Sequence, residues 1–138
     1  DNFEFKSYET SLDVKDFDTS FVKGLSFEDG CATLTKFTAY LIADGLRKIN
    51  KHNNVNPHQY IFCGGGRKNK SLMQSIENYL LNKNIIIKDI DDYNFDGNFI
   101  ESQAFAYLAI RKILELPISF PNTTGCKIAC TGGEIIRN

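Results

Sequence analysis

Apolar residues in the first half of the chain recur at a helical spacing. Between residues 34 and 49 they return every three or four positions, so that one face is apolar and the other polar. The segment "SFED", from Ser26 to Asp29, is typical of a capping box, in which the serine accepts from an exposed amide and the acidic residue reaches back. The pattern predicts one long amphipathic helix that begins at "SFED" and ends near Asn50.

Short apolar runs further along the chain predict strands that alternate with helices. The runs are "QYIFC" at 59–63, "NIIIKDI" at 84–90 and "CKIAC" at 126–130. Between the first two, residues 72–80 return to helical spacing, and Asn69 precedes them as the expected N-cap. The alternating order favours an α/β fold with parallel strand pairing, in which right-handed crossovers place helices on the sheet faces.

A third helix is expected over residues 99–116, "FIESQAFAYLAIRKILEL". This segment is apolar over most of its circumference, which predicts a well-buried helix. Its aromatic residues Phe105 and Tyr107, like Phe37 and Tyr40 in the first helix, are interpreted as core. The first ten residues alternate enough to suggest a strand.

Composition excludes several classes of protein. The chain has 138 residues and a net charge of −1, which argues against a nucleic-acid partner because phosphate affinity depends on clustered Lys and Arg. No run is long and apolar enough to predict a membrane span, and no secretory signal layout is present. The four cysteines match no zinc spacing, so we expect free thiols in a reducing cytoplasm.

Three consecutive glycines, Gly64, Gly65 and Gly66, follow the first predicted strand and precede a helix. Such a loop brings backbone amides and a helix N-terminus towards an anion, at the strand end where α/β folds bind ligands. Neither the P-loop pattern nor the dinucleotide fingerprint fits the residues that follow. The loop by itself therefore leaves two hypotheses open: a nucleotide site, or a tight turn that packs a helix on a sheet.

Three acidic residues, Asp89, Asp91 and Asp92, follow the second predicted strand. Hard oxygen ligands of this kind suit magnesium, but runs of charge are usually solvated. We interpret the run as a solvated loop face and expect no metal site. Asp96 is interpreted as a structural residue of the turn that follows. Cys63, before the glycines, is interpreted as a small buried apolar residue.

Several blocks in fixed order carry a family resemblance. They are "SFEDGCATLTKFTAYLIADGLRKI", "CGGGRKNKSLMQSI", "DGNFIESQAFAYLAIRKILELP", "PNTTG" and a closing "GG". Together they resemble the C-terminal part of anhydro-N-acetylmuramic acid kinases, from about Leu12 onward. The resemblance implies a ribonuclease-H-like lobe of the actin/hexokinase ATPase fold, with short parallel strands and helices on both faces. Residues 26–138 would form the C-terminal nucleotide-binding lobe, and residues 1–25 an extended segment leading to an N-terminal lobe.

The resemblance also implies a reaction. Kinases of this family use ATP and Mg²⁺ to act on 1,6-anhydro-N-acetylmuramic acid in peptidoglycan recycling. Water opens the anhydro bridge, and the freed 6-oxygen takes the γ-phosphoryl group to give N-acetylmuramic acid 6-phosphate. The family's phosphate-binding signature and its catalytic aspartate belong to the N-terminal lobe and have no match here. The resemblance thus implies a fragment that is inactive alone.

Residue roles follow from the matched blocks. Gly64, Gly65 and Gly66 would line the nucleotide, and Asn69 would cap the helix, touch the ribose, or both. Lys68 would either place a positive charge near the phosphates or be a solvated side chain at the helix start, since lysines are usually exposed. Glu101 would contact the sugar or orient the attacking water, although a carboxylate in the first turn of a helix is also favourable with the helix dipole. Arg67 stands where the family often has alanine, so no role is assigned to it.

Other hypotheses remain open at this point. They are another sugar or acetate kinase of the same superfamily, a non-catalytic nucleotide-binding module and, from the CxxxC of Cys126 and Cys130 alone, a thiol redox protein. A separate lobe exposes faces that its partner lobe would cover, and exposed apolar patches favour self-association. We therefore expect a homodimer or a swapped arrangement.

Overall fold

The computed structural model describes residues 14–53, 58–81 and 85–136. They divide into two compact units, one spanning Thr19–Glu101 and the other combining Asp1–Asp18 with Ser102–Asn138. The strand expected over the first ten residues lies outside the described residues. No helix in the described ranges is both long and apolar enough to cross a membrane.

The first unit begins with a short 3₁₀ turn, Ser20–Val22, and the long helix α1, Phe27–Asn53. The predicted capping box is present in a variant form. The N–H of Asp29 donates to Oγ of Ser26 at 3.1 Å, and that hydroxyl donates to the Asp29 carboxylate at 2.9 Å. The helix continues three residues beyond the predicted end at Asn50.

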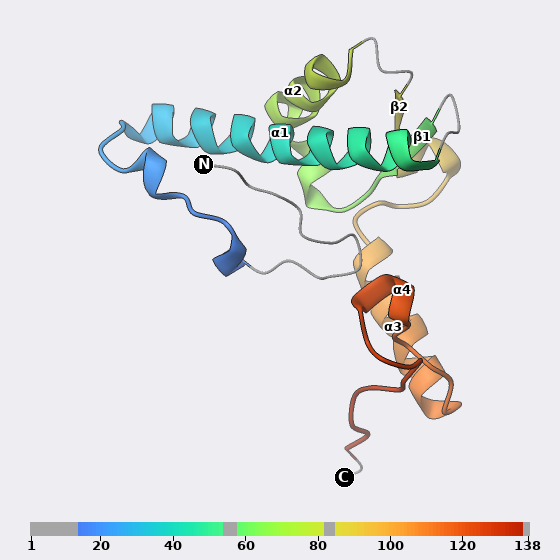
Figure 1. Cartoon of the computed structure of the whole chain (residues 1–138). Helices are drawn as coiled ribbons and strands as arrows, with labels where there is room; N and C mark the ends of the chain where they lie inside the picture. The colour runs from blue at the N-terminus through green and yellow to red at the C-terminus, as the bar shows by residue number, and fades with distance from the viewer. Residues whose placement is uncertain (1–13, 54–57, 82–84, 137–138) are drawn as a thin grey trace. The chain divides into compact units, whose positions relative to one another are not determined.

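Two parallel strands follow, joined through a second helix (Figure 1). Strand β1 spans His58–Phe62, α2 spans Lys70–Leu80 and β2 spans Ile85–Asp89. The register places Phe62 opposite Asp89, so both strands end at the same edge. Parallel pairing is possible because α2 carries the chain back to the start of the sheet. The prediction of an α/β fold with parallel pairing is confirmed.

The core of this unit lies where α1, α2 and one face of the sheet meet. Ala39 and Ala43 of α1 are fully buried against Ile76 and Leu80 of α2. Partly buried hydrophobic side chains surround them: Ile42, Leu46, Phe62, Leu72, Met73, Ile85 and Ile87. The small alanines let the two helices approach closely, as ridge-into-groove packing requires.

The opposite face of the sheet is open in the described residues. Ile61 of β1 is 47% exposed and Ile86 of β2 is 42% exposed. Alternate residues of a strand point to opposite faces, so these two side chains lie away from the core. The helix layer predicted for both faces is therefore present on one face of this sheet.

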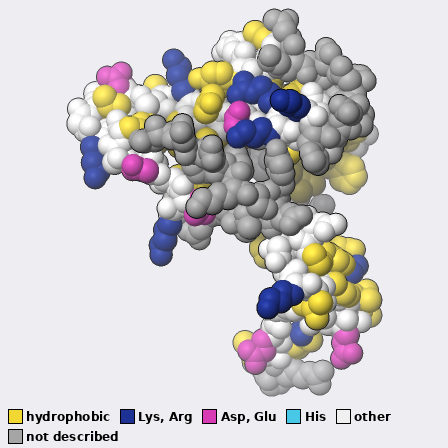
Figure 2. All heavy atoms as spheres, viewed as in Figure 1, with side chains coloured by type: hydrophobic (Ala, Val, Ile, Leu, Met, Phe, Trp, Pro, Cys, Tyr) yellow, Lys and Arg dark blue, Asp and Glu magenta, His cyan; other side chains and the backbone are white. Residues whose placement is uncertain are grey.

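The second unit contains most of α3, Ile100–Ile113, the short α4, Pro121–Thr124, and a 3₁₀ turn, Val14–Asp16. The prediction that α3 is well buried is wrong within this chain, because none of its residues is buried. Figure 2 shows hydrophobic side chains at the surface of the part that Figure 1 labels α3 and α4. Phe105 is 65% exposed and Tyr107 57% exposed, so they are not core residues here. Tyr40 is also exposed, and Phe37 is partly buried.

The prediction of a third strand at "CKIAC" is also wrong. Only Cys130 pairs, in an isolated antiparallel bridge with Ser119. A different contact orders the segment after α3: the guanidinium of Arg111 donates through Nε to the Pro117 carbonyl at 2.7 Å. The described residues therefore contain a two-stranded sheet, β1–β2, and no third strand.

Candidate functional site

The three glycines lie at the carboxyl end of β1, where parallel sheets bind their ligands. Gly64 has φ 80° and ψ 175°, a backbone conformation that L side chains rarely adopt. Residues Gly65–Lys68 then form a 3₁₀ turn that leads into α2. Cys63, which precedes Gly64, is exposed rather than buried as expected, and all four cysteines are free thiols.

Neither backbone conformation nor packing explains why positions 65 and 66 are glycines. Neither has a positive φ. Among the described residues, a Cβ built on Gly65 meets no atom within 4 Å, and one on Gly66 meets only Cδ2 of Leu72 at an ordinary 3.8 Å. An alanine would fit both positions as the chain stands. The loop therefore presents bare backbone to an open space beside the start of α2.

Asn69 caps α2, as predicted. Its Oδ1 accepts from the N–H of Leu72 at 3.1 Å, and its backbone is extended, as is usual for an N-cap. The cap fixes the direction in which α2 leaves the glycine loop.

Substitution at Asn69 separates its two candidate roles. Asn69→Ala is expected to lower the free energy of unfolding by about 1 kcal/mol, whereas Asn69→Ser keeps an oxygen in the cap and restores most of it. Urea unfolding of the two variants checks this. If Asn69 also touches the ribose, Asn69→Ser will bind the nucleotide more weakly even though its stability is restored. Unchanged nucleotide affinity in Asn69→Ser would limit the role of Asn69 to the cap.

A groove with a volume of about 440 Å³ lies beside the loop, between α1 and α2. Its walls come from the first half of α1 and from α2 as far as Asn78, with Asn69 and Ser71 at the end next to the glycines. Residues lining it are Cys31, Ala32, Thr35, Lys36, Asn69, Ser71, Gln74, Ser75 and Asn78. The sequence alone did not point to this groove, because its polar residues are scattered along two helices and meet only when the helices pack.

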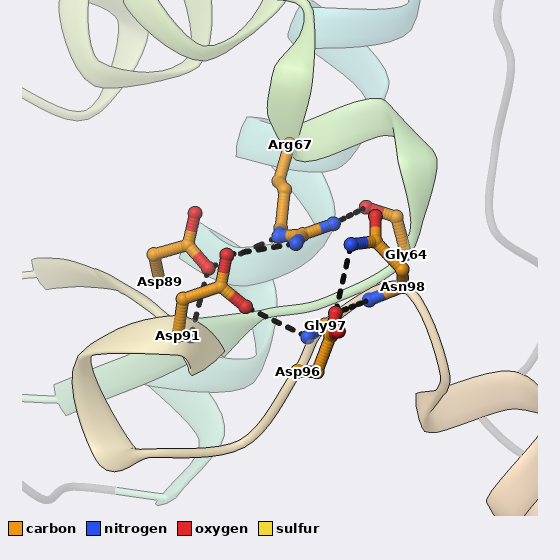
Figure 3. A network of polar contacts seen from close by, with 7 residues as sticks. All are labelled: Gly64, Arg67, Asp89, Asp91, Asp96, Gly97 and Asn98. Carbon is orange, nitrogen blue, oxygen red and sulfur yellow. Dashed lines mark hydrogen bonds and ion pairs between the residues drawn. The ribbon is translucent and has the colours of Figure 1, made fainter.

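The side chain of Arg67 is the centre of a polar network behind the loop (Figure 3). It is only 3% exposed. Its Nε donates to Oδ1 of Asp89 at 3.1 Å, its Nη2 to Oδ2 of Asp91 at 2.8 Å, and its Nη1 to the Gly64 carbonyl at 3.0 Å. Asp89 and Asp91 are 40% and 51% exposed, in line with the solvated loop face expected from the sequence. Their ion pairs with Arg67, a residue to which the sequence analysis assigned no role, were not expected.

Gly97 closes the network on its far side. Its N–H donates to Oδ1 of Asp91 at 2.7 Å. A Cβ at this position would lie 2.5 Å from Cζ of Arg67, so the guanidinium packs directly on the glycine backbone. The neighbouring residues stabilise the turn: Asn98 donates its backbone N–H and its side-chain amide to Oδ1 of Asp96. This agrees with the structural role expected of Asp96.

The charges in the network stabilise one another. The hydrogen bond from Arg67 holds the pKa of Asp91 below its ordinary value, and the Gly97 N–H and the positive charge of Lys68 act in the same direction. The same bond to Asp91 raises the pKa of Arg67 above its already high ordinary value. Both groups are therefore charged at neutral pH.

Lys68 and Glu101 differ from Arg67 in their surroundings. The side chain of Lys68 is exposed at the end of the 3₁₀ turn. Glu101 is exposed in the first turn of α3, four residues after Gly97, and its carboxylate makes no hydrogen bond or ion pair with the described residues. Both side chains are thus available to a ligand.

The described residues include no group of three or more His, Cys, Asp and Glu side chains arranged to hold a metal ion. Near the loop, Asp89 and Asp91 already bind Arg67. One oxygen of each carboxylate is already in an ion pair with Arg67, whose positive charge would also repel a divalent metal, so this pair does not suit one.

Comparison with known proteins identifies the family of this chain. The family model for anhydro-N-acetylmuramic acid kinase matches residues 3–138, almost the whole chain. The chain belongs to this family. It is 55% identical over 141 residues to the anhydro-N-acetylmuramic acid kinase of Pelagibacter ubique, and that alignment covers 100% of this chain. Relatives of the same name from Zymomonas mobilis and Caulobacter vibrioides are each 41% identical over 91% of the chain.

The chain spans about a third of the length of these relatives. The matched part is 37% of the Pelagibacter ubique kinase and 32% of the other two. In this chain, the matched part contains the glycine loop, the Arg67 network and the start of α3.

Proposed function

We propose that this chain is the C-terminal, nucleotide-binding lobe of a kinase that acts on 1,6-anhydro-N-acetylmuramic acid. The whole enzyme would use ATP to open the anhydro bridge with water and to phosphorylate O6, giving N-acetylmuramic acid 6-phosphate in peptidoglycan recycling. Residues 26–138 would form the lobe and residues 1–25 would lead to an N-terminal lobe. Membership of the family and the names of its relatives support this proposal.

One observation carries the nucleotide part of the proposal. Gly65 has open space at its Cβ position and no positive φ, so neither packing nor strain requires a glycine there. A ligand that lies against the backbone does require one, because any side chain would occupy the ligand's place. The position at the end of a parallel strand and before a capped helix suits the phosphates of a nucleotide.

The groove between α1 and α2 suits the rest of the nucleotide. Its volume of about 440 Å³ lies within the usual range of small-molecule sites. Asn69 and Ser71 lie between the glycines and the groove, so a nucleotide with its phosphates at Gly64–Gly66 would direct its adenosine into it. Lys68, exposed at the loop, would add a positive charge near the phosphates.

Magnesium would accompany the ATP, but the described residues do not fit it. The nearest carboxylates are held by Arg67. We infer that any protein ligands of the ion come from outside the described residues, and no step is assigned to the metal here.

Glu101 is the proposed contact to the sugar. It is exposed in the first turn of α3, and a carboxylate there accepts hydrogen bonds from sugar hydroxyls without losing the favourable interaction with the helix dipole. The chain supplies no residue to which we assign the catalytic base. The lobe alone is therefore expected to be inactive. The whole enzyme is proposed to act in the cytoplasm, because the four cysteines are free thiols and a reducing compartment keeps thiols free.

The proposal is tested with the full-length protein that carries this chain. Incubation with ATP, Mg²⁺ and 1,6-anhydro-N-acetylmuramic acid should give ADP and a sugar heavier by one water and one phosphoryl group, measured by mass spectrometry. Acetate, glucose and N-acetylmuramic acid serve as comparison substrates. Turnover of one of these in place of the anhydro sugar would identify a different kinase, and nucleotide binding without any turnover would indicate a non-catalytic module.

A homodimer remains part of the proposal. Phe105, Ile110 and Ile113 of α3 are each more than half exposed, which is unusual for large apolar side chains on one short helix. Light scattering of the purified 138-residue chain should give the mass of a dimer at high concentration and a lower mass on dilution. A monomer mass at every concentration would contradict this expectation.

A further inference from the structure

Arg67 cannot contact a nucleotide itself, yet it contacts the loop that is proposed to bind one. Its side chain is 3% exposed and its guanidinium already has three partners, Asp89, Asp91 and Gly64. A buried arginine with two carboxylates is a fixed group, because its planar fork holds several partners in one geometry. Apart from its charge, which Asp89 and Asp91 offset, Arg67 can act on a ligand only through the backbone that it holds.

The bond to Gly64 has a geometric consequence for Gly65. The peptide between these residues is planar and trans, so its C=O and N–H point in opposite directions. Because the Gly64 carbonyl accepts from Nη1 of Arg67 at 3.0 Å, the N–H of Gly65 points away from the guanidinium. This peptide turns about ψ of Gly64 and φ of Gly65, and two consecutive glycines impose few steric restrictions on that rotation in the absence of the arginine.

The same guanidinium connects three segments of the first unit. Gly64 follows β1, Asp89 ends β2 with Asp91 just after it, and Gly97 precedes α3. Asp91 bridges to the last of these through the Gly97 N–H. Figure 3 shows Arg67 in the middle of these contacts, so the loop cannot shift relative to the other two segments without breaking an ion pair.

We propose that Arg67 is a positioning residue for the nucleotide phosphates. By holding the Gly64 carbonyl, it orients the Gly64–Gly65 peptide so that the Gly65 N–H donates to a phosphate oxygen. This rests on the proposed nucleotide site. It assigns the phosphate preference of that site to a buried side chain that makes no contact with the ligand.

The test compares two ligands that differ only in their phosphates, ADP and adenosine, on the full-length kinase. Calorimetry gives both dissociation constants for the unmodified enzyme, Arg67→Met and Arg67→Lys. Arg67→Met should weaken ADP binding about tenfold or more, the cost of one hydrogen bond to a charged group, and leave adenosine binding within about twofold. Arg67→Lys keeps the positive charge but not the planar guanidinium. Its affinity for ADP should therefore lie between that of the unmodified enzyme and that of Arg67→Met.

Two further variants separate positioning from damage to the fold. Gly97→Ala keeps Arg67 but places a Cβ 2.5 Å from Cζ of Arg67, so the guanidinium must move. This variant should therefore also lose affinity for ADP. Arg47→Met is the matched control: Arg47 also pairs with an aspartate, Asp44 at 3.2 Å, but lies in α1 away from the loop, and both affinities should stay unchanged. All variants are measured well below their thermal unfolding midpoints.

Each outcome decides for or against the proposal. Selective loss of ADP affinity in Arg67→Met and Gly97→Ala supports it. Equal loss of ADP and adenosine affinity, or unchanged ADP affinity in the folded variants, would overturn it while leaving the nucleotide site in place. If the unmodified kinase binds neither ligand, the proposed function itself fails, and the role of Arg67 fails with it.

Discussion

Gly65→Val is expected to remove most of the ATP-dependent activity proposed for the full-length protein without unfolding it. The valine Cβ meets no atom of the described chain within 4 Å, and the backbone of Gly65 has no positive φ, so the side chain begins in open space and without backbone strain. The side chain instead occupies the space proposed for the phosphates. Displacement of a substrate by about 1 Å can cost about 100-fold in rate, so kcat/KM for ATP should fall at least that far.

The matched control is Gly30→Val in α1, where a Cβ also meets no neighbour. Its kcat/KM for ATP should stay close to that of the unmodified enzyme. Thermal unfolding of both variants, followed by circular dichroism, verifies that the loop variant is folded. A folded Gly65→Val enzyme with normal kinetics for ATP would show that the loop is only a turn.

Ile76→Ala is expected to have the largest effect on stability. Ile76 is fully buried between α1 and α2, where it packs with Ala39 and Ala43. Removing its outer carbons leaves a cavity that the two short alanines cannot fill. Losses of about 2–5 kcal/mol are typical of such substitutions, and urea unfolding of the chain measures the difference.

Ile86→Ala provides the comparison for this core substitution. The same atoms are removed, but Ile86 is 42% exposed on the open face of the sheet, so the loss should be well below that of Ile76→Ala. Equal losses of unfolding free energy in Ile76→Ala and Ile86→Ala would mean that the open face of the sheet is covered in solution.

The elements of the first unit were predictable because local signals agree with the tertiary packing. The capping box at Ser26, the helical spacing of α1 and the cap at Asn69 each determine a helix start through short-range hydrogen bonds. The strand runs around Phe62 and Ile87 are apolar where they meet the helices. In each case the residues that give the signal are also the residues that make the contact.

The second unit was less predictable because apolar composition does not say what covers a helix. The side chains of α3 are apolar, which suggested burial, yet Phe105 and Ile113 are about two-thirds exposed in this chain. The segment "CKIAC" has the composition of a strand but no partner strand among the described residues, so Cys130 forms a single bridge. Burial and strand pairing depend on other segments and cannot be inferred from the segment itself.

The candidate site was predicted in part. The glycines and the cap could be located from the strand–loop–helix order, whereas the Arg67 network could not be recognised from residue types alone. A signal was nevertheless present: Arg67 follows one parallel strand closely, and Asp89 and Asp91 lie at the end of the neighbouring strand. Parallel strands end at the same edge, so opposite charges after both strands predict an ion pair there.

The most direct test of the central claim, that the glycine loop binds the nucleotide, is an ADP titration of the full-length kinase labelled with ¹⁵N-glycine. The account predicts that the amide resonances of Gly65 and Gly66 shift with ADP and saturate at its dissociation constant. Gly30, on α1 and outside the loop, should not shift. Saturable ADP binding that leaves Gly65 and Gly66 unchanged would contradict the account and would locate the nucleotide elsewhere in the enzyme.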